Sequence, residues 1–548
     1  MNAETTPRVH ASVSRIPVAA LALLLLLLCL RLPSLVQPAG ADQALYGYVG
    51  TRVLAGELPY RDAWDQKPPA IHFTYAVLVG LWRHDSVVAL ADLVVAGAVA
   101  ALLVALGRRA AGSTAAGVTA AALFLLLGDP TFNRLSGVRI RAQCETFIAL
   151  AVTAAILSAL RSRPPASETD AGYSPRWAVL AGVLAGLAFT FKYNTLTYVP
   201  VALMAIAMSR PRPQTLMKAG AAMALGAMLP VAALLLLFAL GGALDDLYYA
   251  TIKYNLEYSG ETYAGAGSFV RYLLTFPIGH ARVDALWTLG GLGCMILIAA
   301  WVTDRRRIDV LLPVAWVAAA CLSIAINGSR GLPQYFVQAA PGLAMAAGWA
   351  AALLWPAGLV AQRYRTPLRV AVVLLVAYGA WRVNEFDKIP RNAAHDLAFI
   401  TGRLSREDHL ARYGGQPDAK YAALSVHRLA GYLEQRTSPS DFIYIFGFSP
   451  GAYVNSGRVS ASRFFWSRPV LVGFNDGVPG YGADGVLAEL QQRPPRYVVL
   501  QIHDWAPPPN DSVTFFTQSP LLGPWLRAHY RQVEVFEDYE IWVRAEGS

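Results

Sequence analysis

The chain has little of what soluble domains and secreted scaffolds depend on. Only 15% of its 548 residues are charged, against about 25% in ordinary soluble domains. It has four cysteines, Cys29, Cys144, Cys294 and Cys321, all in or beside apolar runs. This number and spacing supply neither a disulfide framework nor a cysteine metal site. The nine histidines show no H-E-x-x-H or comparable ligand spacing, so no metal or other cofactor is predicted.

Long apolar runs are abundant instead. Hydrophobic residues make up 55% of the chain, and runs long enough to cross a bilayer recur through most of it. We predict about eleven helical membrane spans, at residues 17–32, 86–106, 112–128, 143–160, 177–191, 195–209, 219–241, 284–302, 310–326, 337–357 and 368–382. The first run resembles a signal peptide. Because the A-x-A triplet Ala39-Gly40-Ala41 lies well beyond that run, we favour a retained helix.

Basic residues in the short segments between the spans predict the topology. Six clusters are present, at Arg8/Arg15, Arg108/Arg109, Arg161/Arg163/Arg176, Arg210/Arg212/Lys218, Arg305/Arg306/Arg307 and Arg363/Arg365/Arg369. The positive-inside rule places all six in the cytoplasm, so the net charge of +10 does not indicate a nucleic-acid partner. With the N-terminus inside, an odd number of spans puts the C-terminus outside.

One apolar run is left out of the spans. Ala70 to Trp82 is about 13 residues long, which is too short to cross a bilayer comfortably. If it crossed, every later basic cluster would face the wrong side. We therefore predict a re-entrant or interfacial helix, so that residues 33–85 form a single outer loop.

The composition changes near residue 383. We predict a membrane domain over residues 1–382 and a soluble α/β domain over 383–548, outside the cytoplasm. Helices are expected at 419–434 and 485–492, strands at 441–446 and 496–500, and a hairpin from 533–536 and 540–543. Strands that alternate with helices are typical of an α/β unit.

The first outer loop carries the most informative residues of the chain. Its charged residues include Asp42, Arg61, Asp62, Asp65 and Lys67, in an otherwise apolar protein. Charges beside membrane spans are costly, so such a cluster is a functional-site hypothesis. A solvated outer loop is the alternative.

The pattern of this loop resembles that of family-39 glycosyltransferases, which are membrane enzymes of the GT-C superfamily. The family includes protein O-mannosyltransferases and the bacterial transferase that adds aminoarabinose to lipid A. The matching residues are Asp42-Gln43, then Gly56-Glu57-Leu58-Pro59-Tyr60-Arg61-Asp62 and Trp64-Asp65-Gln66-Lys67-Pro68-Pro69. Weaker similarities lie at Glu145, at Phe191-Lys192, and at Gln334-Tyr335 followed by Pro341. Bacterial relatives often end in a periplasmic α/β domain.

The resemblance implies a transferase of the bacterial inner membrane. Such an enzyme moves a sugar from a polyprenyl-phosphate donor to a hydroxyl of an envelope lipid, glycan or protein, with inversion. Asp42 matches the family's first-loop aspartate and is the predicted catalytic base. Gln43 stands where many members have Glu, which weakens the case for a metal at this pair. The predicted substrate-binding residues are Arg61, Asp62, Asp65, Lys67, Glu145, Lys192, Gln334 and Tyr335.

Several of these residues have a plainer interpretation. Asp62 and Asp65 suit turns. Lys67 and Lys192 suit snorkelling lysines at a membrane interface. The tyrosines of the expected outer loop 242–283 form either an aromatic belt or a sugar-stacking surface.

Two other functions compete with glycosyl transfer. A transporter or flippase for a lipid-linked glycan would place ionisable groups in mid-membrane and show repeated halves. A serine hydrolase would use Ser449 in Gly447-Phe448-Ser449-Pro450-Gly451. Pro450 argues against the hydrolase, because proline lacks the N–H that would complete an oxyanion hole.

The basic clusters and the odd number of spans lead to a test of topology. A periplasm-specific reporter should be active when fused after Ser548 and inactive when fused at Arg306, and a cytoplasm-specific reporter should give the reverse result. A cytoplasmic C-terminus would separate the tail from the first loop and contradict this topology.

Overall fold

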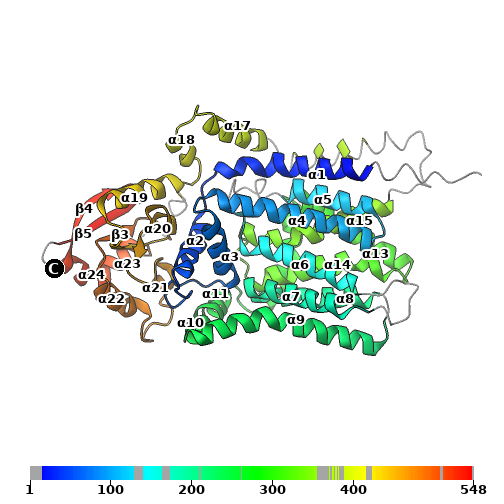
Figure 1. Ribbon diagram of the computed structural model, residues 1–548, viewed down its shortest axis with the longest axis horizontal. Helices are drawn as coiled ribbons and strands as arrows, with labels where there is room; N and C mark the ends of the chain where they lie inside the picture. The colour runs from blue at the N-terminus through cyan, green and yellow to red at the C-terminus, as the bar shows by residue number, and fades with distance from the viewer. Residues whose placement is uncertain are drawn as a thin grey trace, which may run out of the picture.

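The structure is a computed structural model in which two parts are joined end to end (Figure 1). It describes residues 15–128, 140–162, 173–208, 211–260, 262–354, 388–414, 422–505 and 510–545, with short pieces between 370 and 381. A bundle of roughly parallel and antiparallel helices forms one part, and a unit built around a small sheet forms the other. The predicted boundary at 382–383 lies outside the described residues.

Ten helices make up the bundle in the described part of the chain. They are α1 (Arg15–Arg31), α4 (Ser86–Ala110), α5 (Thr114–Leu127), α6 (Cys144–Arg161), α7 (Pro175–Phe191), α8 (Val199–Ala207), α9 (Pro213–Leu240), α13 (Ala285–Thr303), α14 (Leu311–Ile326) and α15 (Ala340–Leu354). Short 3₁₀ segments extend several of them, at η1 (Leu32–Val36), η5 (Tyr193–Tyr198), η7 (Ile308–Val310) and η8 (Pro333–Ala339).

These helices match the predicted spans. Seven helical segments are long and apolar enough to cross a membrane, and they agree with seven predicted spans. Three more predicted spans match the shorter apolar helices at 114–127, 175–191 and 193–207. The eleventh, 368–382, falls mostly outside the described residues. The chain is therefore a multi-pass membrane protein.

Small residues bring α7 and α9 into close contact. A Cβ placed on Gly182 would collide with the backbone oxygen of Met223, and one on Gly226 with that of Val179. Membrane helices lack a hydrophobic driving force toward each other, so close backbone packing of this kind contributes much of their association.

The first outer loop is more helical than the sequence indicated. The predicted interfacial helix is present as α3 (Ala70–Leu81), and α2 (Ala41–Leu54) precedes it. Both lie across the end of the bundle, between it and the sheet unit (Figure 1). The sequence of α2 shows no periodic apolar stripe, which is why the helix was not predicted. The helix is buried on several sides rather than on one face, and it contains Gly47 and Gly50. A Cβ on Gly50 would lie 2.8 Å from the α3 backbone.

The expected outer loop 242–283 is also helical. It contains α10 (Leu244–Tyr248), a π-helical turn η6 (Tyr249–Lys253), α11 (Tyr254–Gly260) and α12 (Ala266–Ala281). Tyr254 is buried and packs edge-on to Trp64, and Tyr249 packs against Tyr481 of the tail. Of the tyrosines considered for a membrane belt, Tyr248 is half exposed. Tyr249 and Tyr254 instead help join the bundle to the tail.

The C-terminal unit is the predicted α/β tail. Its elements are α17 (Lys388–Ile400), α18 (Arg406–Ala411), α19 (Ala423–Arg436), β1 (Phe442–Phe446), α20 (Pro450–Ser456), β2 (Val459–Ser460), α21 (Arg468–Leu471), α22 (Gly482–Gln492), β3 (Tyr497–Gln501), α23 (Ser512–Gln518), α24 (Leu522–His529), β4 (Tyr530–Phe536) and β5 (Tyr539–Arg544). The strand order is β2-β1-β3-β5-β4. β1 runs parallel to β2 and β3, and the predicted β4–β5 hairpin adds antiparallel strands at the other edge.

Hydrogen bonds and aromatic packing dock the tail on the first loop. The backbone N–H of Trp64 donates to Arg463 O at 2.9 Å, and Trp466 Nε1 donates to Trp64 O at 3.0 Å. The Trp64 ring is fully buried. On α2, Tyr48 Oη accepts the N–H of Ser460 at 2.9 Å. The tail and the first outer loop therefore lie on the same side of the bundle, as predicted.

A buried ion cluster joins three segments at the end of the bundle that faces the tail. Asp92 on α4 accepts hydrogen bonds from Arg31, at the end of α1, and from Arg141, which precedes α6, the latter at 2.8 Å. All three side chains are nearly inaccessible to solvent. Buried charges of this kind are tolerated only when they are paired.

We predict that Asp92→Asn strongly destabilises the fold, because two buried guanidinium groups would lose their counter-charge. Breaking a buried pair in this way costs roughly 3–5 kcal/mol. Thermal unfolding of the detergent-purified protein measures the effect, with Glu257→Gln, an exposed carboxylate on α11, as control. Equal unfolding temperatures for wild type and Asp92→Asn would show that the cluster contributes nothing.

Candidate active site

Asp42 lies in the first turn of α2, at the end of the bundle that faces the tail. The carboxylate is half-buried, and Gln143 Nε2 approaches Asp42 Oδ2 at 3.5 Å. Burial raises the pKa of Asp42 above its ordinary value, while the charges of Lys67 and Lys192 oppose the shift and Glu145 adds to it. The N-terminus of a helix favours a negative charge, which also helps keep the group ionised. A carboxylate of raised pKa is a better proton acceptor than a free aspartate.

Lys67 provides the matching positive charge. Its side chain is half-buried, and its Nζ makes no hydrogen bond or ion pair with any residue that the structure describes. Burial lowers the pKa of Lys67, but Tyr335, Asp42 and Asp65 more than offset this effect, so the pKa lies above its usual range. Lys67 is therefore a cation that faces the Asp42 region and has no fixed partner.

Two side chains hold the backbone around Lys67. Tyr60 Oη donates to Lys67 O at 2.7 Å, and Asn255 Nδ2 donates to Gln66 O at 2.7 Å. Tyr60 has a φ of 73°, a left-handed conformation that is strained for a residue with a side chain. Two residues after Lys67 the chain enters α3, and Pro69, the N-cap residue of this helix, already has a helical backbone conformation.

The buried side chain of Asp65 contacts the backbone that leads to Lys67. It is buried, accepts the N–H of Gln66 at 2.7 Å, and lies 3.3 Å from His72 Nε2 on α3. Burial raises the pKa of Asp65 to about 6 and lowers that of His72 to about 3, so His72 is neutral at pH 7. The structure thus places Asp65 where it positions Lys67 rather than where it meets a substrate.

Glu145 and Lys192 form a buried pair beside this region. Lys192 Nζ donates to Glu145 Oε1 at 2.6 Å and lies 4.4 Å from the centre of the Tyr335 ring. Both side chains are nearly inaccessible, which argues against Lys192 as a snorkelling lysine. The predicted residue Gln334 precedes Tyr335 and is half-buried.

Two predicted site residues lie elsewhere. Asp62 accepts the N–H of Leu58 at 2.8 Å, and Arg61 pairs with Asp62 and donates to Gly241 O at 2.7 Å. These contacts build the turn that the sequence offered as the plainer interpretation. Nothing in the geometry brings Arg61 or Asp62 to Asp42.

Sequence reasoning missed the residues that position Asp42. Gln43 Nε2 donates to the carbonyl of Arg141 at 2.9 Å, and Tyr46 Oη donates to Gln143 Oε1 at 3.2 Å. Gln143 in turn reaches Asp42. Arg141, which accepts the hydrogen bond from Gln43, also pairs with Asp92. Asp92 was the sequence signal for this network, because an unpaired carboxylate in an apolar span would be prohibitively costly and so requires a cationic partner.

The side chains around Asp42 do not fit a metal centre. Gln43 and Gln143 present amide donors to neighbouring oxygens, and Glu145 is paired with Lys192. Over the described ranges, no group of three or more His, Cys, Asp or Glu side chains is arranged to hold an ion.

The serine hydrolase alternative has no supporting geometry. Ser449 is buried, and its hydroxyl hydrogen-bonds with Gln501 Oε1 and with Tyr539 Oη, both at 2.9 Å. These partners fix the serine in the tail and do not provide the general base that nucleophile activation requires.

No protein-family model matches the sequence, and no curated protein matches it. Solved structures do match. ArnT from Cupriavidus metallidurans bound to undecaprenyl phosphate has a TM-score of 0.57 at 16% identity, covering 98% of this chain and 99% of ArnT. Archaeal AglB from Archaeoglobus fulgidus, in complex with an inhibitory peptide and a dolichol-phosphate, has a TM-score of 0.52 at 12% identity, covering 98% of this chain and 75% of AglB.

The chain has a GT-C fold. The match confirms the predicted class of fold, a helical membrane bundle with a small C-terminal α/β unit. It extends over nearly the whole of ArnT, so the C-terminal unit belongs to the shared architecture.

The electrostatics around Asp42 predict a shift in pH dependence. Lys67→Met removes a charge that lowers the pKa of Asp42. Because only the ionised carboxylate accepts a proton, the acid limb of the activity profile should move to higher pH. Sugar transfer, the activity that the sequence resemblance implies, is measured against pH to test this, with Arg271→Met, an exposed cation on α12, as control. An acid limb that stays in place would mean that Lys67 and the titrating base do not interact.

Proposed function

We propose that this protein is a membrane glycosyltransferase that moves a sugar from a polyprenyl-phosphate donor to a hydroxyl of a cell-envelope acceptor. One observation carries the proposal. At the outer end of a GT-C bundle, the half-buried carboxylate of Asp42 and the half-buried, unpartnered ammonium of Lys67 lie within electrostatic reach of each other.

The lipids bound to the neighbouring structures support the class of donor. ArnT was solved with undecaprenyl phosphate, and AglB with a dolichol-phosphate. Both ligands are polyprenyl carriers that end in a phosphate. A donor of this kind is confined to the bilayer, which agrees with a site at the end of the bundle rather than in the tail.

Asp42 would act as the general base. It takes the proton of the acceptor hydroxyl while that oxygen forms a bond to the anomeric carbon. The bond from the anomeric carbon to the phosphate oxygen breaks at the opposite face, its electron pair leaves with the polyprenyl phosphate, and the configuration inverts. A hydroxyl is a weak nucleophile, so the reaction needs a base at this position.

Lys67 would stabilise the departing phosphate. Negative charge develops on the leaving group, and a fixed cation in a partly desolvated site is most effective against it. Lys67 is suited to this because its segment is held rigidly and its ammonium is uncommitted. Lys192 adds positive charge nearby but is already neutralised in part by Glu145.

The site would face the outside of a bacterial inner membrane. The basic residues in the last turn of α4, such as Arg109, and those just after α13, such as Arg306, lie at the opposite end of the bundle from α2, α3 and the tail. The positive-inside rule then places Asp42 and the tail outside the cytoplasm.

A flippase or transporter is the second candidate, and the position of the charges disfavours it. The charged groups of the proposed site, Asp42 and Lys67, lie on α2 and on the loop that follows it, at one end of the bundle. Transporters place such groups near the middle of the membrane.

The decisive variant is Asp42→Asn. It keeps the shape and hydrogen-bonding capacity of the side chain but removes the base, which should lower the transfer rate by about 10²–10⁴-fold. Mass spectrometry of envelope lipids and glycans provides the readout, in cells that lack the protein and are complemented with wild type or variant.

The matched control is Asp245→Asn, an exposed carboxylate on α10. We expect wild type and the control to restore the missing sugar and Asp42→Asn to fail, at equal levels of folded protein in the membrane. Full restoration by Asp42→Asn would place the base elsewhere and overturn this assignment.

A further inference from the structure

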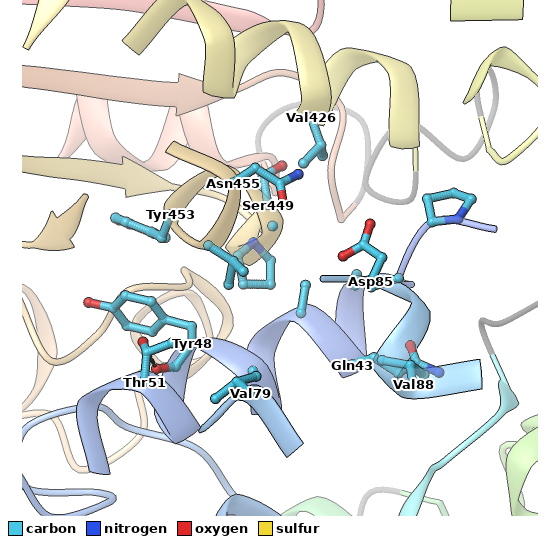
Figure 2. Close-up of a pocket in the computed structure, with 18 of the residues that line it drawn as sticks. Gln43, Tyr48, Thr51, Val79, Asp85, Val88, Val426, Ser449, Tyr453 and Asn455 are labelled. Atoms are coloured by element: carbon cyan, nitrogen blue, oxygen red, sulfur yellow. Dashed lines mark hydrogen bonds between the residues drawn. The ribbon is translucent and has the colours of Figure 1, made fainter. Parts of the chain in front are cut away.

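A cavity of about 560 Å³ lies between the first outer loop and the tail. Figure 2 shows its walls: Tyr48 and Thr51 from α2 and Val88 from α4 lie on one side, and Val426 and Tyr453 from the tail lie on the other. Neither the Asp42 nor the Lys67 side chain lines it. The cavity is therefore separate from the candidate active site, although both use the first turn of α2.

The lining combines an apolar floor with a basic rim. Valine and aromatic side chains form much of the floor, including those at positions 48, 75, 79, 87, 88, 426, 448, 453 and 454. Four basic side chains stand at the rim: Arg83 and His84 before α4, Arg406 at the start of α18, and His427 on α19. This pairing of surfaces suits a ligand with an anionic head and an apolar body.

Two of these cations are uncommitted. The exposed side chains of Arg83 and Arg406 make no hydrogen bond or ion pair with any described residue. By contrast, Arg52 is paired with Glu57, and Arg458 donates to the backbone carbonyls of Ser456 and Thr437. Two unpaired guanidinium groups from separate parts of the chain thus converge on one cavity.

Asp85 is the acidic member of the lining. Its half-buried carboxylate accepts the backbone N–H of Ala39 and lies in the field of His84, Arg406 and His427. One carboxylate against two arginines leaves the rim positive even when both histidines are neutral.

The cavity lies at the level where lipid headgroups are expected. α3 crosses the end of the bundle beside it (Figure 1). The C-terminal half of α3 exposes Val77 and Leu81, by 61% and 79%, and Trp82 follows, 46% exposed. Apolar and tryptophan side chains next to an arginine are typical of a helix that rests in the membrane interface.

We propose that this cavity binds the phosphate-bearing headgroup of an anionic membrane lipid, with Arg83 and Arg406 on the phosphate and the first part of the lipid body on the apolar floor. Guanidinium groups suit phosphate because their planar donors match its oxygens. The site is distinct from the donor site, and the bound lipid would bridge the first loop and the tail.

Lipid binding by the full-length protein tests the proposal without any assay of transfer. The protein is reconstituted in nanodiscs of phosphatidylcholine that contain phosphatidylglycerol, and retained lipid is counted by native mass spectrometry after release. The double variant Arg83→Ala/Arg406→Ala should retain phosphatidylglycerol about tenfold less than wild type, as expected for the loss of charge-assisted hydrogen bonds. Arg282→Ala/Arg403→Ala is the control, because both residues are exposed arginines outside the lining.

Three further measurements separate the contributions of head and body. Diacylglycerol, which has the same chains without phosphate, should be retained less than phosphatidylglycerol. Val426→Trp, which fills the floor without changing charge, should reduce phosphatidylglycerol retention. Inorganic phosphate alone should bind more weakly than the lipid.

Three results would overturn the proposal. The first is equal phosphatidylglycerol retention by wild type and the arginine double variant. The second is equal retention of diacylglycerol and phosphatidylglycerol. The third is inorganic phosphate binding as tight as that of the lipid, which would indicate a site for a soluble anion.

Discussion

The pairing of Asp92 with Arg31 and Arg141 is the interaction on which the outer end of this protein depends. A carboxylate in an apolar helix is tolerable only if cations neutralise it, and here they come from two other segments of the chain. One charge therefore fixes the end of the first span and the approach to α6. The same approach carries Gln143, which reaches Asp42, so the constraint extends to the proposed base.

The remaining charges divide into those that hold the site and those that are available for chemistry. Glu145 and Lys192 are buried against each other, and Asp65 is turned inward to the backbone beside Lys67. Among the described residues proposed for the site, Asp42 and Lys67 are the two that are half-buried, lie in each other's electrostatic field and have no ion-pair partner. One carboxylate and one cation therefore remain available at the proposed site, which suits a reaction that moves one proton and releases one phosphate.

The tail is not an independent folded unit, because it packs against the membrane bundle's first loop. Through Trp64 and Tyr48 it packs directly on the loop that carries the site, and so it restricts the positions that this loop can adopt. The same contact encloses the cavity between α2 and α20. A bundle of this fold without its tail would have neither the aromatic packing around Trp64 nor a closed wall opposite α2.

The sequence by itself determined the class of fold, the positions of most spans, the interfacial helix at 70–82 and the principal strands of the tail. Each of these features depends on local properties of the sequence: the length of an apolar run, the placement of basic residues, and the spacing of apolar residues along a helix or strand. Asp42 and Lys67 were also identifiable, because charge is conspicuous in an apolar chain and their loop resembles a known pattern.

Only the tertiary structure separated the charged residues that are paired within the protein from those that we propose for the reaction. Asp62 and Asp65 look alike in sequence, yet one builds an exposed turn and the other is buried against His72. The partners of Asp92 and the cavity beside α2 are likewise invisible in the sequence. In each case the deciding contacts join residues far apart in the chain, and the cost of an unpaired buried charge depends on the whole fold around it.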